Sequence, residues 1–383
     1  MHGAKRIRHR WREQVHDKRK QKVMVVIGTR PEAIKMWPVI QALEAHQECQ
    51  THVCLTAQHR DMLDMFVAEL GIHPDSDLNL MRSGQTLAEL SGRLIPAFSQ
   101  LLQQHKPDMV LVQGDTTTAA LAALTAFYDD IYVGHVEAGL RSGNRRSPFP
   151  EEVNRRMTAT LADLHFAPTK QAQANLLAEG IPADAVLVTG NTVIDAVKGM
   201  AGEVPQSPSP KVLMTAHRRE NFGKPLQEIL AGVRQIASEY PDLEIIYPVH
   251  PNPNVYAPAH EVLGSIANIH LCEPMGYREF VTQMQKAWFV LSDSGGVQEE
   301  ATALGRPVLL LRKETERPEG MAAGNVRAVP LQRDGVASAV RDMLEDSALR
   351  QSMMTVSDVF GDGAAGQRIV EATLSFLQQE KQK

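Results

Sequence analysis

Cysteine is scarce and long apolar runs are missing, and both shortages narrow what this chain can be. The 383 residues include three cysteines, at Cys49, Cys54 and Cys272, whose spacing fits neither a zinc site nor an even-numbered disulfide framework. No run of 18 apolar residues is present, which argues against a transmembrane helix. The N-terminus also lacks the apolar segment of a secretory signal. We therefore expect a cytoplasmic protein with reduced thiols.

Neither sign of charge dominates the chain, but the charge is unevenly placed. The formal net charge is −5, which provides no general attraction to nucleic acid or to an anionic membrane. Residues 1–22 carry nine Lys and Arg and two acids, a formal +7, which leaves −12 for residues 23–383. We interpret residues 1–22 as a basic tail that is disordered or a start-site extension, although such a segment can also bind nucleic acid or an anionic surface.

Short apolar runs alternate with longer amphipathic segments along most of the chain. The runs are apolar throughout, which is typical of strands buried on both faces of a parallel sheet. The segment 203–211 contains three prolines and two serines and is a candidate linker. We predict an α/β fold of two Rossmann-like, doubly wound domains that face a cleft, over residues 23–200 and 211–361. The predicted strands are 22–28, 51–57, 108–114, 131–138, 164–169 and 185–190, then 212–217, 244–250, 268–274, 288–296 and 307–312.

The sequence GDGAAG at 361–366 has the glycine spacing of a dinucleotide-binding loop. It follows a helical pattern rather than a strand, and 17 residues remain after it. That length is too short for a βαβ unit. We interpret the segment as a turn before a last helix, within 362–383, that packs back on the first domain.

Carboxylates follow several predicted strands and turns of the first domain. Asp115 follows VLVQG, Glu137 follows VGHV, and Glu151 and Glu152 follow the turn PFP. Since ligands of open α/β sheets bind at the carboxyl ends of the strands, we expect these acids to line the cleft. Without a Cys or His pattern for zinc, they suggest proton transfer, although magnesium bound through carboxylates stays open. A helix-capping role is the alternative for Asp115.

The second domain carries features that suit a diphosphate. In SDSGGVQEE (292–300), Ser294, Gly295 and Gly296 are predicted to open a helix after a strand, where free N–H groups and the helix dipole favour an anion. Glu300, about one turn into that helix, is placed to accept hydrogen bonds from ribose hydroxyls. Four further side chains are candidates to reach the anion, with a surface or structural role as the alternative for each: Arg30 and Lys35 in GTRPEAIK, His217 in HRREN and Arg317 in ETERPEG.

Taken together, these motifs closely resemble one family. GTRPEAIKM, TAQHRDML, GDTTTAALAA, GHVEAGLRSGN, PFPEEVNRR, TGNTVIDAV, HRREN, YPVHPNPNV, SDSGGVQEE and TERPE occur in the same order as in the non-hydrolysing bacterial UDP-N-acetylglucosamine 2-epimerases. The resemblance covers roughly residues 23–375 and excludes only the basic tail.

The resemblance implies a glycosyltransferase-B-like fold, a homodimer and the reversible conversion of UDP-GlcNAc to UDP-ManNAc without a redox cofactor or a metal. It implies catalytic roles for Asp115, Glu137, Glu151 and His217. It implies nucleotide or substrate binding by Arg30, Lys35, Phe280, Ser294, Gly295, Gly296, Glu300 and Arg317. Gln58, His59 and Arg60 match a region that contacts an allosteric UDP-GlcNAc in many members, and Met275 departs from a frequent Gln.

Several other functions stay open. A hydrolysing 2-epimerase would release free ManNAc and UDP, and a related epimerase would act on another UDP-sugar. A glycosyltransferase shares the fold but needs an acceptor site that the sequence does not indicate. A nucleotide-sugar-binding protein without catalysis would not need the three acids. Nucleic-acid binding is disfavoured by the negative charge of residues 23–383.

Overall fold

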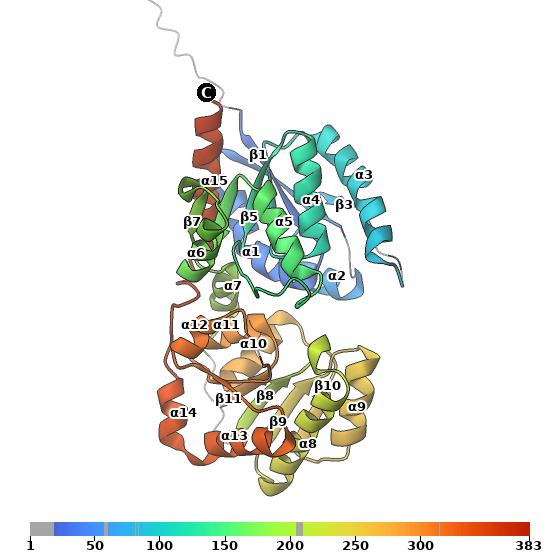
Figure 1. The fold of residues 1–383 in the computed structure, drawn as a ribbon, viewed down its shortest axis with the longest axis vertical. Helices are drawn as coiled ribbons and strands as arrows, with labels where there is room; N and C mark the ends of the chain where they lie inside the picture. Colours follow the sequence, from blue (N-terminus) through green and yellow to red (C-terminus); the bar gives the residue numbers. More distant parts are fainter. Residues whose placement is uncertain (1–18, 57–59, 81, 83, 204–209, 314) are drawn as a thin grey trace, which may run out of the picture.

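Two α/β domains, one above the other, make up the protein (Figure 1). The structure is a computed structural model that describes residues 19–56, 60–80, 82, 84–203, 210–313 and 315–383, with residues 60–62 described only by their backbone. Within these residues the strands form two parallel sheets, one of seven strands and one of six. The predicted fold class, two Rossmann-like doubly wound domains, is confirmed.

The first sheet has the strand order β3-β2-β1-β4-β5-β6-β7, so its order reverses between β1 and β4. Its strands are β1 (Gln21–Ile27), β2 (Cys49–Leu55), β3 (Ser76–Asp77), β4 (Met109–Gln113), β5 (Tyr132–Val136), β6 (Leu164–Ala167) and β7 (Val186–Val188). The helices between and after them are α1 (Arg30–Ala45), α2 (Arg60–Glu69), α3 (Leu87–His105), α4 (Thr117–Tyr128), α5 (Glu151–Leu161), α6 (Lys170–Ala178), the 3-10 turn η1 (Ala183–Ala185) and α7 (Thr192–Met200).

The second sheet has the order β10-β9-β8-β11-β12-β13 and reverses between β8 and β11. Its strands are β8 (Lys211–Thr215), β9 (Glu244–Pro248), β10 (Ile269–Cys272), β11 (Phe289–Ser292), β12 (Val308–Leu310) and β13 (Val326–Ala328). The helices are η2 (Arg219–Asn221), α8 (Lys224–Glu239), α9 (Pro253–Leu263), α10 (Tyr277–Lys286), α11 (Gly295–Ala303), α12 (Pro318–Ala322), α13 (Arg333–Glu345), α14 (Ser347–Met353) and α15 (Ala365–Glu380).

Strand β1 shows why these runs are apolar throughout. Val23, Val25 and Ile27 pack into one hydrophobic cluster, with residues of α1 and α7. Met24 and Val26, which point to the other face, pack into a second cluster with residues of α3 and α4. A strand that is covered by helices on both faces needs apolar side chains at every position.

The last helix, α15, runs beside the first domain although it follows the second in the chain (Figure 1). Ile369, Leu374 and Leu377 are buried in the same cluster as Val39 and Leu43 of α1. The chain thus crosses between the domains twice. The boundaries 23–200 and 211–361 remain predictions.

The predicted strands differ from the observed ones mainly at their ends. The strand predicted at 131–138 ends at Val136, because Glu137 adopts a left-handed backbone with φ 63°. The sequence did not indicate β3 and β13, two edge strands of two and three residues. Such short segments contain too few positions for a pattern to be seen. Strand β1 begins at Gln21, inside the range expected for the basic tail, and residues 1–18 lie outside the described part of the chain.

Among the described residues, no helix combines the length and the apolar character that crossing a bilayer requires.

Candidate active site

Glu137 lies at the centre of a buried group of polar side chains in the first domain. Lys35 Nζ on α1 lies 2.5 Å from Glu137 Oε1 and 2.7 Å from Oε2. Asn191, at the start of α7, donates to Oε1 at 2.8 Å, and Gln113 at the end of β4 donates to Oε2. Burial alone raises the pKa of Glu137, but Lys35 and Arg317 outweigh it and lower the pKa to about 2. Glu137 is therefore held as a carboxylate, with both oxygens already accepting hydrogen bonds.

The second domain completes this group through Arg317 and Glu299. Arg317 Nη2 lies 3.6 Å from Glu137 Oε1, and Arg317 Nε donates to Glu299 Oε1 at 2.8 Å. Asn191 donates to Glu299 as well, at 3.0 Å. Burial lowers the pKa of Arg317, but the negative charges of Glu299 and Glu137 raise it by a larger amount. The guanidinium therefore stays charged. These contacts tie the two domains together with alternating charges.

Asp115 is oriented by side chains of α5. Arg155 Nε donates to Asp115 Oδ2 at 2.9 Å, and Asn154 Nδ2 donates to its backbone carbonyl at 2.9 Å. The Nε2 atom of His135 lies 2.7 Å from the carbonyl oxygen of Gly114, the residue before Asp115. Burial lowers the pKa of His135 to about 3, so this imidazole is neutral and Nε2 carries the donated hydrogen. The Asp115 side chain is 30% exposed and can reach a ligand.

Glu151 and Glu152, adjacent at the start of α5, have opposite environments. The Glu152 side chain is fully buried and accepts from the backbone N–H groups of Ser142 and Gly143 and from Arg155. Glu151 Oε2 is buried without a hydrogen-bond partner in the described residues. Burial and the nearby Asp115 raise the pKa of Glu151, while Arg218 of the second domain lowers it. The Glu152 carboxylate is therefore engaged by hydrogen bonds within the first domain, whereas Glu151 keeps one carboxylate oxygen without a partner among the described residues.

His217 follows β8 in the second domain and lies above a buried carboxylate. Asp293 Oδ2 accepts from the backbone N–H groups of His217 and Arg218 and from Asn221 Nδ2. The His217 ring stacks on His250, with 5.5 Å between ring centroids, and its side chain is 37% exposed. Burial lowers the pKa of His217, and Asp293 partly offsets this. Burial therefore favours the neutral imidazole, and part of the ring is exposed.

Helix α11 begins within the SDSGG motif, directly after β11. Ser294 is the N-cap residue, and the helix begins at Gly295. A Cβ on Gly295 would lie 2.5 Å from Arg317 Nη1, so a side chain at this position would displace the Arg317 guanidinium. A Cβ on Gly296 would meet no atom within 4 Å. The first N–H groups of a helix have no partner within the helix, and the Arg317 guanidinium lies close to the first residue of this one.

Three other predicted binding residues occupy different settings. Glu300 is buried and accepts a hydrogen bond from the Tyr277 hydroxyl at 2.9 Å, and burial raises its pKa. The Arg30 guanidinium carbon lies 4.1 Å from the centroid of the Phe66 ring. Phe280 is 7% exposed and packs in the core of the second domain, so it has little surface with which to contact a base.

Sequence reasoning missed several residues of this site, although each stands within a motif that had been noticed. Gln113 precedes the GD of GDTTT, Asn191 stands in TGNT, and Glu299 precedes the predicted Glu300. A search of every polar residue within two positions of a strand end would have found Gln113 and Asp293. Of the residues predicted to be allosteric, Gln58 and His59 lie outside the described residues. Arg60 opens α2, but its side chain is not described.

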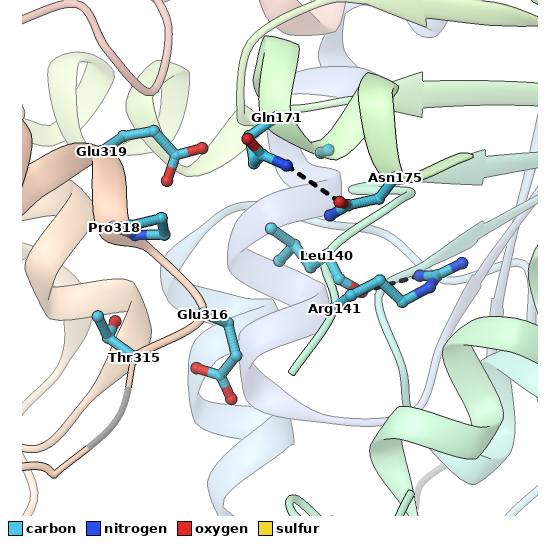
Figure 2. A pocket seen from close by; sticks show the side chains of 9 residues that line it. Leu140, Arg141, Gln171, Asn175, Thr315, Glu316, Pro318 and Glu319 are labelled. Carbon is cyan, nitrogen blue, oxygen red and sulfur yellow. Dashed lines mark hydrogen bonds between the residues drawn. The ribbon is translucent and has the colours of Figure 1, made fainter. Parts of the chain in front are cut away.

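A cavity of about 200 Å³ lies between the domains (Figure 2). Residues of the first domain, among them Arg141, line one wall, and residues of the second domain, among them Glu319, line the other. Its polar lining is largely engaged: Arg141 is bound to Glu179 at 2.7 and 2.9 Å, and Gln171 donates to Asn175 at 3.1 Å. Asp115, Glu137, Glu151 and His217 do not line it. Across the described part of the chain, no group of three or more His, Cys, Asp or Glu residues is arranged to hold a metal ion.

Comparison with known proteins identifies the family of the chain. Residues 41–374 match the sequence model of the family described as UDP-N-acetylglucosamine 2-epimerase. The chain is 47% identical over 363 residues to the UDP-N-acetylglucosamine 2-epimerase of Bacillus subtilis. The alignment covers 93% of this chain and 96% of that protein.

Solved structures agree at the level of the fold. The Neisseria meningitidis UDP-GlcNAc 2-epimerase bound to UDP-GlcNAc superposes with a TM-score of 0.88 at 45% identity, over 93% of this chain and 100% of that one. The glycotransferase of kitacinnamycin, at 12% identity and a TM-score of 0.61, covers 94% of this chain and 99% of that one and shares the fold alone. The glycosyltransferase-B-like prediction is thereby confirmed. The chain belongs to the UDP-N-acetylglucosamine 2-epimerase family.

Proposed function

We propose that this enzyme interconverts UDP-GlcNAc and UDP-ManNAc by elimination and re-addition of UDP. The observation that carries the proposal is that Glu151 of the first domain interacts both with Asp115 of its own domain and with Arg218 of the second, the residue next to His217. Two carboxylates are needed because a proton leaves one face of the sugar C2 and returns to the other. The facing cations and neutral histidine suit a diphosphate that carries the leaving charge.

In the first step, a carboxylate takes the C2 proton while the bond between C1 and the diphosphate oxygen breaks. A C1–C2 double bond forms, which gives 2-acetamidoglucal and UDP. In the second step UDP adds back to C1 and an acid delivers a proton to the opposite face of C2. Removal of the C2 proton without departure of UDP would be far less favourable. The carbanion that it leaves could not be stabilised, because C2 is not next to a carbonyl group.

The environments of the three acids suggest how the work is divided. The pKa of Glu151 is raised by burial, which suits a group that holds and delivers a proton. Asp115, ion-paired to Arg155 and 30% exposed, suits a base. Glu137 already accepts from Lys35, Asn191 and Gln113, so we assign it the role of holding the cations in place.

Nucleotide binding belongs to the second domain in this proposal. The N-terminus of α11 at Ser294, Gly295 and Gly296 binds the diphosphate, with Arg317 beside Gly295. Arg30 interacts with Glu300 of the same helix and is a further cation for the nucleotide. Glu300 accepts hydrogen bonds from the ribose. Phe280 belongs to the same region but is buried in the core. No redox cofactor enters this scheme.

The experiment is to incubate the enzyme with UDP-GlcNAc in D₂O and to follow the products by proton NMR. UDP-ManNAc with deuterium at C2 is the expected result. Free ManNAc and UDP would instead identify a hydrolysing 2-epimerase. No change at high substrate, with folded protein, would mean that the sugar is a different one or that the site only binds.

A homodimer in the cytoplasm is part of the same proposal. Phe127 and Tyr128, at the end of α4, are 58% and 68% exposed, which is unusual for two adjacent aromatic residues. The three cysteines are free, as expected for a reducing compartment. Sedimentation equilibrium of the wild type and of Phe127→Glu would test the dimer, and a monomeric wild type would refute it.

A further inference from the structure

Glu69, the last residue of α2 in the first domain, caps helix α10 of the second domain. Glu69 Oε2 accepts from the backbone N–H of Tyr277 at 2.7 Å, and Glu69 Oε1 accepts from that of Arg278 at 2.8 Å. The N-cap residue of α10 is Gly276, which provides no side-chain cap. The first N–H groups of α10 are thus satisfied by a carboxylate from the other domain.

Gly276 leaves room for the Glu69 carboxylate, and its backbone conformation does not require glycine. Its φ of −60° is accessible to any residue. A Cβ at this position would lie 2.9 Å from Glu69 Oε2 and 3.2 Å from Glu69 Cδ. Any side chain here would therefore push Glu69 away. The absence of a side chain at Gly276 thus allows the Glu69 carboxylate to reach the N–H groups of α10.

Tyr277 extends the contact to the predicted nucleotide site. Its side chain is buried, and its hydroxyl donates to Glu300 Oε1 at 2.9 Å. Glu69 thus holds the start of α10, and the first residue of α10 orients the carboxylate predicted to bind ribose. The path from α2 to Glu300 consists of two hydrogen-bonded steps.

The same helix also supports Arg30. Phe66, one turn before Glu69, is buried and lies under the Arg30 guanidinium at 4.1 Å. Helix α2 therefore contacts one predicted nucleotide-binding side chain directly and a second through Tyr277. These two side chains come from different domains, so their relative position depends on how the domains are held.

We propose that Glu69 is a positioning residue that holds the domains closed over the nucleotide. Separation of the domains breaks both hydrogen bonds of Glu69, so the contact favours the closed arrangement in which Arg30 and Glu300 face one ligand. A ligand that binds only this arrangement gains affinity from any contact that stabilises it. The inference rests on the proposed function, because it needs a nucleotide bound between Arg30 and Glu300.

The test compares wild type with Glu69→Ala, Glu69→Gln and Tyr277→Phe, and uses Glu44→Ala, at an exposed position of α1, as the matched control. UDP affinity is measured by calorimetry and turnover of UDP-GlcNAc by NMR. Hydrogen–deuterium exchange of the 274–284 region is measured without ligand. The melting temperature of each variant shows whether it folds.

We expect Glu69→Ala to weaken UDP binding and raise KM by about 3- to 30-fold, the range of a lost helix cap, with kcat changed less than about 3-fold. Exchange should rise at the start of α10 and not across the second domain. Glu69→Gln should recover part of the affinity because it keeps one acceptor oxygen. Tyr277→Phe should weaken UDP binding without faster exchange at the start of α10.

Two results would overturn the inference in different ways. If wild type binds UDP and Glu69→Ala binds it equally well, Glu69 has no positioning role and the proposed function stands. If wild type binds no UDP, the proposed function fails and this inference fails with it. A uniform rise in exchange with a large fall in melting temperature would make Glu69 structural only and would also refute the inference.

Discussion

Lys35 and Glu137, 102 residues apart in the chain, form a buried ion pair in which one ammonium group contacts both carboxylate oxygens, at 2.5 and 2.7 Å. Neither side chain is more than 10% exposed. Arg317 is a second cation, 3.6 Å away from the same carboxylate. The pair therefore links a helix and a strand end of the first domain to a residue of the second.

Replacing Lys35 by Met should destabilise the protein by about 3–5 kcal/mol at pH 7, because Glu137 would be left buried with one weaker cationic partner. The measurement is urea unfolding from pH 7 to pH 3. The folded pKa of Glu137 is lowered from 4.5 to about 2, so its contribution is complete above pH 4.5 and is lost as the pH falls toward 2. The difference in unfolding free energy between wild type and Lys35→Met should therefore narrow below pH 4.5.

Lys198→Met, which removes an exposed pair with Asp358 at 3.5 Å, is the control and should change stability by less than about 1 kcal/mol. A gap that stays constant with pH would contradict this account.

Glu151→Gln and Glu152→Gln, side by side in sequence, should have different effects. Glu151→Gln should lower kcat by about 10²–10⁴-fold, because a positioned general acid or base typically contributes a rate factor of that size. The variant should not lose stability. Its folded pKa is raised, so the charged form opposes folding above that pKa, and glutamine should be at least as stable as wild type at pH 8. Below pH 4 the carboxyl group is neutral in both the folded and unfolded states, and the difference should vanish.

Glu152→Gln should instead lower the melting temperature, because glutamine cannot replace a carboxylate that accepts from Ser142, Gly143 and Arg155. Differential scanning calorimetry and NMR turnover on both variants separate the roles. Full activity in Glu151→Gln would remove it from the mechanism.

Gly295 and Gly296 provide a second matched pair. A methyl group on Gly295 would lie 2.5 Å from Arg317, so Gly295→Ala should destabilise the unliganded protein by about 1–3 kcal/mol. A methyl group on Gly296 meets no protein atom within 4 Å, so Gly296→Ala should be as stable as wild type. The same methyl group would occupy space in which we propose that UDP binds, so UDP binding should weaken. Thermal unfolding without ligand, followed by UDP titration, distinguishes these effects. Unchanged UDP affinity in Gly296→Ala would mean that the ligand does not approach this turn.

Leu374→Ala should show that α15 belongs to the core of the first domain. Leu374 is 3% exposed and packs with α1 residues, so its truncation should cost about 2–5 kcal/mol. Gln367→Ala, on the exposed side of the same helix, should stay within about 0.5 kcal/mol. Urea unfolding followed by peptide-resolved hydrogen exchange would locate the loss in the first domain. Loss confined to residues 211–361 would refute this assignment.

The sequence by itself determined the fold class and the edge of each sheet where the site lies. Runs that are apolar on both faces, separated by amphipathic helices, are compatible with few folds other than parallel α/β, because strand burial shows in local composition. Polar motifs such as HVEAG and SDSGG stand directly after such runs, which places them at the strand ends. Order along the chain was sufficient for these conclusions.

Only the tertiary structure decided which of those polar residues act together. Glu151 and Glu152 are indistinguishable in sequence, and what separates them is whether backbone N–H groups from 142–143 reach the carboxylate. Glu299 and Asn191 join the site because the two domains bring them within 3.0 Å of each other. Glu69 meets Tyr277 across 208 residues of chain. Such contacts depend on the packing of whole domains, and since a hydrogen bond forms or fails over less than 1 Å, no local pattern contains them.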